Sequence, residues 1–336
     1  MSGRGGFVLR KVAWAAVTVF VVLTFNFVLF RVLPGDPAKS GLRDPRLNPQ
    51  AVEALRDRFG LDLPLFLNLE EGANPLDSQY TRYLGALARG DLGTSYAFRD
   101  QEVSGLIGQA LVNTLWLILP AEFLAIVLGA GLGLFAAWRR GRALDVGALT
   151  FSLFTWSLPT FFLGIILLIA GSSWFGLPTG GRVTIGAEFT SFWEMAWDVG
   201  RHLILPTLTL ALVLLGEYML IMRSSVLDVF GEDYILTARA KGLSTYRIIR
   251  HHALRNAMLP MVTLIALNLG FTVSGAIQIE HVFSWPGLGA LTVGAIGDRD
   301  YPVLQGAFLL LAIAVVVANL VAELIYGWLD PRVSEA

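Results

Sequence analysis

Six long apolar runs divide the sequence and limit what it can fold into. A helix needs about 20 mainly apolar residues to cross the hydrocarbon core of a bilayer. The chain is 55% hydrophobic and 15% charged, which is too apolar for a soluble domain of 336 residues. We therefore predict an all-α, polytopic membrane protein with six transmembrane helices, over residues 9–32, 107–138, 146–174, 203–222, 257–279 and 304–328.

Basic residues in the short connections predict the orientation of these helices. They precede the first run, follow the second, and crowd the connection between the fourth and fifth, residues 233–260. Short loops rich in Lys and Arg face the cytoplasm. Because six spans place both ends of the chain on one side, we expect cytoplasmic termini. The basic residues are Arg4, Arg10 and Lys11, then Arg139, Arg140 and Arg142, then Arg239, Lys241, Arg247, Arg250 and Arg255.

The same pattern predicts the order of segments along the chain. Residues 1–33 hold the N-terminus and a first helix that is too long for the apolar part of a cleavable signal, so we expect it to be retained. Residues 34–104 form an extracytoplasmic segment, with a short amphipathic helix at 49–60 and turns at Asn74–Pro75 and around Gly90, Asp91 and Gly93. Residues 105–336 form the remaining core.

The basic connection begins as a short helix and a glycine turn. Asp233 is placed to cap a helix that runs to Lys241, and Gly242 suits the left-handed residue that follows a helix end. Leu243 is then expected to fold back toward Ala238. We predict a helix, a glycine elbow and a second helix.

The second helix is expected to start at Ser244 and to run to about Asn256. Tyr246, Ile249 and Ala253 are spaced to share its apolar face. Two interpretations fit an amphipathic, basic element of this kind: it lies on anionic lipid headgroups, or it docks rigidly on a cytoplasmic protein. Its basic and polar surface would hold Arg247, Arg250, His251 and Arg255.

Polar residues within the apolar runs are candidates for a translocation path. A charge at membrane depth costs at least about 2–3 kcal/mol, so such a residue faces the protein interior or a water-filled route. Glu122, Glu217 and Glu323 either line a path or tie helices together. The same two interpretations apply to Asn113 and Asn268, and Glu280 is a further candidate for the path or its outer gate.

Other residues in the runs are expected to shape the helices. Prolines mark helix ends or kinks, and glycines allow close approach of neighbouring helices. The prolines are Pro120, Pro159 and Pro206, and the glycines are Gly129, Gly131 and Gly133.

The residues that carry enzymatic chemistry do not form a site pattern. The chain has no cysteine, no GxxxxGK[ST] phosphate loop, no HExxH and no GxSxG. Its four histidines are not spaced with carboxylates as metal ligands, so we expect them to be solvated or interfacial. We expect no catalytic residue, no metal, no cofactor and no nucleic-acid partner.

Short strings along the whole chain resemble the permease subunits of bacterial ATP-binding-cassette (ABC) importers of the dipeptide/oligopeptide class. The most telling are TARAKG at 237–242 and HHALRNAMLP at 251–260. Their order and spacing are specific, although no single string is. The others are PGDPA at 34–38, GLDLP at 60–64, GDLGTS at 90–95, RHLILPTLTL at 201–210, FSWPGLG at 283–289, RDYP at 299–302 and LDPR at 329–332.

This resemblance implies a type I importer permease fold and a role for the basic connection. In the family, a loop called the EAA loop inserts into a cleft on the ATPase subunit, and residues 233–260 match it. Ala238 and Gly242 keep the pattern, whereas Leu236, Thr237 and Arg255 depart from it as the peptide-importer branch does. The implied coupling residues are Ala238, Arg239, Lys241, Gly242, Arg247 and Arg250.

The resemblance also implies partners and a location. They are a second, homologous permease subunit, two ABC ATPase subunits, an extracytoplasmic substrate-binding protein and the lipid of the bacterial inner membrane. The implied substrates are di- or oligopeptides, and related permeases carry glutathione, nickel chelates or oligosaccharides. Two other classes are alternatives: an ion-coupled secondary transporter, for which inverted repeats or paired broken helices would be expected, and an intramembrane enzyme, which needs a catalytic pair or a metal-ligand pair. None of these features is apparent in the sequence.

Overall fold

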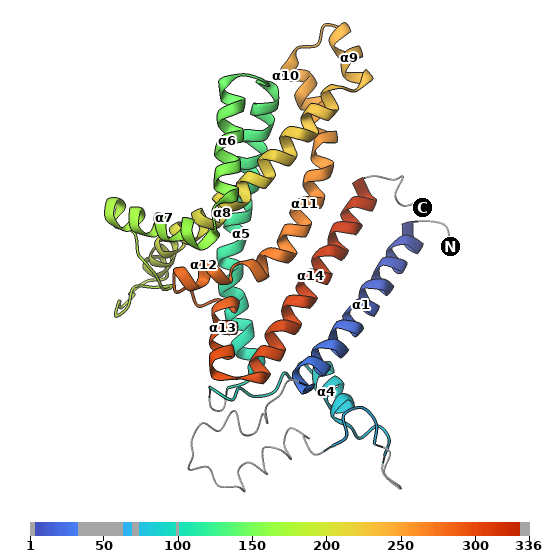
Figure 1. The fold of residues 1–336 in the computed structure, drawn as a ribbon, viewed down its shortest axis with the longest axis vertical. Coiled ribbons are helices and arrows are strands. Elements are labelled where there is room, and N and C mark those ends of the chain that lie inside the picture. Colours follow the sequence, from blue (N-terminus) through green and yellow to red (C-terminus); the bar gives the residue numbers. More distant parts are fainter. Residues whose placement is uncertain (1–3, 33–62, 69–73, 99–100, 330–336) are drawn as a thin grey trace. The chain divides into compact units, whose positions relative to one another are not determined.

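The computed structural model describes residues 4–32, 63–68, 74–98 and 101–329. Within these ranges the regular structure is helical, apart from an isolated bridge between Thr94 and Glu102. This confirms the predicted all-α class. The helices, labelled in Figure 1 where there is room, are α1 (Arg4–Val32), α4 (Gln79–Ala88), α5 (Val103–Trp138), α6 (Ala143–Ser157), α7 (Thr160–Phe175), α8 (Phe192–Phe230), α9 (Asp233–Ala240), α10 (Thr245–Ile248), α11 (Leu254–Gly275), α12 (Ile277–Val282), α13 (Leu288–Asp298) and α14 (Tyr301–Leu329).

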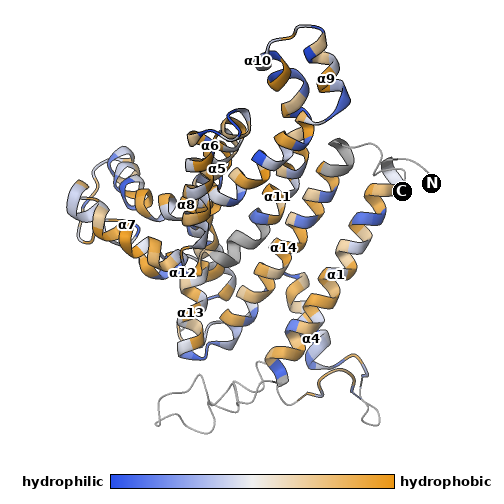
Figure 2. Cartoon of the chain, turned by 45° about the horizontal axis from the view of Figure 1, so that its top comes forward, coloured by the Kyte–Doolittle hydropathy of each residue, from blue (hydrophilic) through white to orange (hydrophobic). Residues whose placement is uncertain are grey.

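Four of these helices are long and apolar enough to cross a membrane: α1, α5, α8 and α14. They cover the first, second, fourth and sixth predicted runs, and the ribbon colours of Figure 2 show hydrophobic residues predominating along α1 and α14. The fifth run, residues 257–279, falls on α11 and α12 and includes side chains 269–275, which lie outside the described part of the chain.

The third predicted run is not one straight helix. Residues 146–174 divide into α6 and α7, which are bent by 104° and count as a single span only as a broken pair. Leu158 lies between them in an extended conformation, with φ −74° and ψ 135°. A residue before proline is disfavoured in the helical region, so Pro159 accounts for the break. Pro120 and Pro206, by contrast, lie inside α5 and α8, which continue through them.

Contacts divide the chain into two compact units. The first holds residues 1–15, 113–289 and 314–336, and the second holds residues 16–112 and 290–313.

In the first unit, α8 is the central helix and contacts α6, α7 and α11. It begins after Ser191, whose side chain accepts a hydrogen bond from the Glu194 amide at 3.2 Å. This start lies well before the predicted residue 203, so that Trp193 and Trp197, which are exposed, belong to its first turns.

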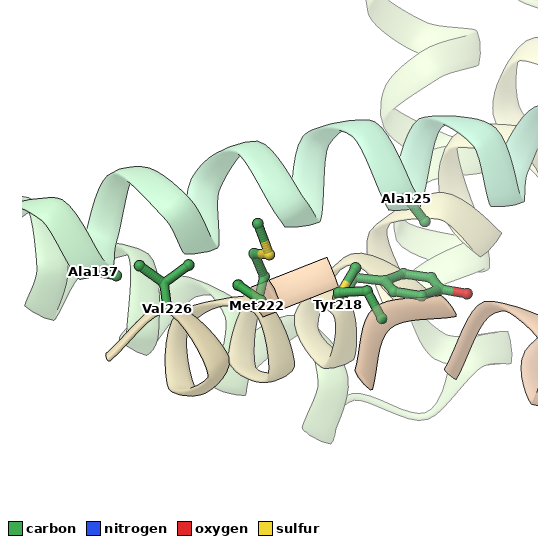
Figure 3. Packing of buried hydrophobic residues seen from close by; sticks show 7 residues of the cluster. Ala125, Ala137, Tyr218, Met222 and Val226 are labelled. Atoms are coloured by element: carbon green, nitrogen blue, oxygen red, sulfur yellow. The ribbon is translucent and has the colours of Figure 1, made fainter. Parts of the chain in front are cut away.

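A buried cluster fills the space between α5, α8 and α11 (Figure 3). Small residues on α5 bring its backbone against α8. A Cβ atom added to Gly133 would lie 2.5 Å from the Met219 carbonyl oxygen, and one on Gly129 would lie 2.7 Å from the Tyr218 Cβ. Close approach is thus confirmed for these two glycines, whereas Gly131 faces open space and that prediction was wrong. The cluster comprises Ala125, Ala137, Tyr218, Met222, Val226, Ala257 and Met261.

The second unit is organised around aromatic rings. Phe27 on α1 packs against Phe66, Tyr80 and Tyr83, with ring centroids 5.2–5.8 Å apart. Helix α4 starts at Ser78, which forms a capping box with Thr81.

The predicted turns of the outer segment are confirmed where they are described. The Asn74 side chain accepts a hydrogen bond from the Leu76 amide at 3.0 Å, and Gly90 and Gly93 have φ values of 74° and 85°. The predicted helix at 49–60 lies outside the described residues.

Candidate functional site

The basic connection forms a helical elbow at one end of α8 and α11 (Figure 1). Helix α9 starts at Asp233, but its N-cap residue is Glu232, so the predicted cap at Asp233 was one residue late. The turn that follows is as predicted. Gly242 has a φ of 75°, and the Leu243 amide donates to the Ala238 carbonyl at 3.2 Å.

The second helix differs from the prediction. Helix α10 starts at Thr245 and passes through a π-helical turn, Ile249–Ala253, directly into α11. The predicted end at Asn256 was therefore wrong. The residues after Asn256 are apolar and lead into a long helix, so no local signal stops it. A π-helical turn inserts one extra residue and frequently marks functional sites.

The elbow has its own small core. Its buried members, Ile235, Ala238, Ile248 and Ala253, pack together with Leu243 at their edge. This core holds α9 against the beginning of the second helix.

Two tyrosines and an asparagine complete the elbow. Tyr246 was predicted to share the apolar face, but it is exposed and its hydroxyl accepts from Arg250 at 3.3 Å. The Asn256 amide donates to the Tyr234 hydroxyl at 2.7 Å, which links α9 to α11.

The outer face of the elbow carries four positively charged residues. Arg239, Lys241, Arg247 and Arg250 are exposed, and within the described ranges no carboxylate pairs with them. Arg239 lies over the Phe230 ring at 5.7 Å. Of the six predicted coupling residues, the structure thus places four cations on one segment, Gly242 at its bend and Ala238 in its core. This surface suits an acidic or polar protein partner.

Three of the predicted path residues meet in one polar cluster between α5, α8 and α11. The Tyr218 hydroxyl donates to Glu122 Oε1, and the Asn268 amide lies 3.1 Å from Glu217 Oε2 and 3.3 Å from the Tyr218 oxygen. Glu122 and Tyr218 are buried, whereas Asn268 is partly buried. Buried polar groups generally need hydrogen-bond partners, which α5, α8 and α11 supply to one another here, except that Glu122 Oε2 has none among the described residues.

The other two path residues belong to a second buried cluster. Asn113 donates to the Pro286 carbonyl at 2.9 Å and accepts, through its own carbonyl, from the Trp285 indole at 2.9 Å. Thr114 donates to Glu280 Oε1 at 2.6 Å and accepts from the Leu288 amide. These bonds join α5 to the turn between α12 and α13.

Sequence reasoning missed Tyr218, Thr114 and Trp285 as members of these clusters. Tyr218 and Thr114 each adjoin a predicted residue, and this adjacency was the available signal. Glu323 pairs with Lys11 at 3.1 Å, which agrees with the interpretation that it ties helices together. One expectation needs correction: His202, expected to be solvated or interfacial, is buried, with Nδ1 2.8 Å from the Asp198 carbonyl oxygen.

Two family models match most of the chain. The model described as "Binding-protein-dependent transport system inner membrane component" matches residues 129–335. A second, for the N-terminal part of a binding-protein-dependent transport system membrane component, matches residues 5–117.

Curated relatives match over nearly the full length. The chain is 37% identical to the di/tripeptide transport system permease protein DppB of Pseudomonas aeruginosa, covering 97% of this chain and 98% of that protein. It is 34% identical to the oligopeptide transport system permease protein AppB of Bacillus subtilis and 35% identical to the glutathione transport system permease protein GsiC of Escherichia coli, with the same coverage.

A solved structure shares the fold. It is a chain of the MetNI methionine ABC transporter in an inward-facing conformation, with a TM-score of 0.54 and 18% identity. The match covers 67% of this chain and 97% of that one.

Proposed function

We propose, because the chain belongs to the family of binding-protein-dependent transport system inner membrane components, that it is the permease subunit of an ATP-driven importer of di- or oligopeptides. Relatives named as di/tripeptide and oligopeptide permeases support this substrate class. The structural observation that supports the proposal is the elbow, an exposed basic helix pair at the end of α8 and α11, which are two of the three helices that form the polar cluster.

The elbow is proposed to transmit the ATPase cycle. The sequence has no nucleotide-binding motif, so energy enters through a contact with another subunit. Helix α9 is fixed to α8 and α11 by its buried core and by the bond from Asn256 to Tyr234. A push on α9 is therefore transmitted to both helices, and through them to a bundle that alternates between two packings.

The polar clusters are proposed to serve the translocation path. Glu122, Glu217 and Asn268 join α5, α8 and α11, the helices that connect to the elbow. In the second cluster, the hydrogen bonds of Asn113 and Glu280 hold α5 to the region of the turn between α12 and α13, which we propose as the outer gate. Motion of α8 and α11 would rearrange the first cluster while the second holds α5 in place.

The proposed assembly follows the family resemblance. It contains a second, homologous permease, two ATPase subunits and an extracytoplasmic binding protein, in the bacterial inner membrane. Glutathione is the second candidate substrate, because a glutathione permease is as similar to this chain as the peptide permeases are.

The test of function is uptake by the reconstituted assembly. Vesicles containing the permeases, ATPases and binding protein should accumulate a labelled dipeptide or tripeptide only with ATP. Competition with unlabelled glutathione separates the two substrates. Uptake that needs an ion gradient but no ATP would contradict the proposal.

The proposed orientation has a separate test. Because the chain contains no cysteine, single cysteines report accessibility without background. Lys241→Cys should react with an impermeant maleimide only after the membrane is opened, since the elbow is proposed to be cytoplasmic. Ile185→Cys, at a position that is 99% exposed, should react in intact spheroplasts. The reverse pattern would invert the topology.

A further inference from the structure

A cavity of about 690 Å³ opens in the second unit, and none of the residues that line it belongs to the elbow or to the polar clusters. The end of α1, helix α4 and the first turns of α14 form its wall, together with the loop before α5. Apolar side chains such as Phe30, Leu87 and Leu309 share this wall with polar ones. A mixed lining of this kind is typical of ligand sites.

Arg31 lies on this wall, and no carboxylate of the described residues pairs with it. Its guanidinium is 5.7 Å from the centroid of the Phe27 ring and interacts electrostatically with the side chains of Tyr83 and Tyr96. In the part of the chain that the structure describes, no Asp or Glu forms an ion pair with it. A partly buried cation is costly unless it is paired. An anion in the cavity would supply the missing charge.

Two residues with neutral donor groups, Tyr83 and Gln305, are among those that line the cavity. Gln305 lies beside the Tyr83 hydroxyl, yet neither this oxygen nor the Gln305 Nε2 completes a hydrogen bond of normal geometry with another described residue, although both atoms are buried. Burial raises the pKa of Tyr83 to about 12, so its hydroxyl stays protonated at neutral pH. Both groups are thus available to donate to an acceptor.

Two carboxylates, Asp91 and Glu102, also line the cavity, and among the described residues neither forms an ion pair with Arg31. Asp91 accepts from the Gly93 amide at 2.8 Å, and Glu102 lies 3.4 Å from the Ser104 hydroxyl. Two further arginines line the cavity: Arg89, and Arg82, which pairs with Asp77 at 2.9 Å. The wall therefore combines three arginines, two carboxylates, neutral donors and a hydrocarbon surface.

We propose that this cavity binds a phosphate group, held by the Arg31 guanidinium and by the Tyr83 and Gln305 donors. An arginine fork matches phosphate oxygens. Two sources share this chemistry: the headgroup of an anionic phospholipid, and free phosphate. The headgroup is favoured because α1 is a candidate span that ends at Arg31, which puts its side chain near headgroup depth. This site goes beyond the proposed transport role and is tested without measuring transport.

The experiment measures binding to the full-length chain purified in neutral detergent. Native mass spectrometry counts bound phosphatidylglycerol, with phosphatidylcholine as the reference lipid, and millimolar inorganic phosphate is added as a competitor. Arg31→Gln should weaken phosphatidylglycerol binding about tenfold or more, because a charge-assisted contact is lost. Arg10→Gln makes the same charge change at an exposed position near the other end of α1 and should bind as the wild type does.

Each outcome decides the proposal. Selective retention of phosphatidylglycerol that resists inorganic phosphate assigns the headgroup, and displacement by inorganic phosphate assigns the free anion. Equal binding by the wild type and Arg31→Gln, or no binding of either probe by the wild type, overturns the site. If Arg31→Gln does not fold, Gln305→Met decides instead: it keeps the charge and should weaken binding a few-fold, and unchanged affinity would count against the site.

Discussion

At the scale of single residues, the backbone conformation of Gly242 favours glycine there, whereas the space around it would admit a side chain. Its φ is 75°, and a Cβ atom added there would meet nothing within 4 Å. Valine in this region costs about 1 kcal/mol or more. We expect Gly242→Val to abolish ATP-driven uptake while ATP hydrolysis continues, whereas Gly242→Asn should retain more uptake because asparagine tolerates the left-handed region.

The measurements are uptake and ATP hydrolysis by the reconstituted assembly. Gly141→Val is the matched control, because Gly141 has a φ of 76° in a different turn. Normal uptake by Gly242→Val, or an equal defect in Gly141→Val, would show that the elbow is not the coupling element.

Tyr218 is the second residue with a specific role, because it connects Glu122 and Asn268. Tyr218→Phe removes a hydroxyl that both of them contact and should destabilise the protein by about 1–3 kcal/mol. Thermal unfolding in detergent micelles measures the loss. The double variant with Glu122→Met should lose less than the sum of the single variants, because it removes both members of the bond. Strict additivity would mean that the two residues do not interact.

At the scale of elements, the contact between α5 and α8 depends on which glycine faces which backbone. Gly133→Ala should lower the unfolding temperature, because its Cβ would meet the Met219 carbonyl and overpacking costs about 1–3 kcal/mol. Gly131→Ala, half a turn away, should be neutral or stabilising by about 0.5–1 kcal/mol, since alanine favours helix over glycine. Equal effects of the two changes would contradict this packing.

At the scale of the whole molecule, the predicted family and the all-α, type I permease fold are confirmed by the family models, the full-length relatives and the shared fold of a solved importer chain. Association with the ATPases remains a prediction. Arg239→Glu with Arg247→Glu should reduce co-purification of the ATPase subunits, more at low salt than at high salt, because exposed charges are screened.

The control for this change is Arg140→Glu with Arg142→Glu. These residues are also exposed and on the same predicted side, and the net charge changes equally. Co-purification that is unaffected by the first pair, or reduced as much by the second, would argue against a basic docking surface on the elbow.

What the sequence determined by itself is local. Hydropathy located the four long helices that could span a membrane. The turn at Gly242 followed from the backbone preference of glycine, and Pro159 marked the position at which α6 ends and α7 begins. Each of these depends on a residue and its near neighbours. The tertiary structure alone decided that Glu122 meets Tyr218, that Thr114 meets Glu280, and that Gly133 but not Gly131 faces a neighbouring backbone. It also decided that the second elbow helix passes into α11. These outcomes depend on how helices rotate and slide against one another, which hydropathy and spacing along one chain do not specify.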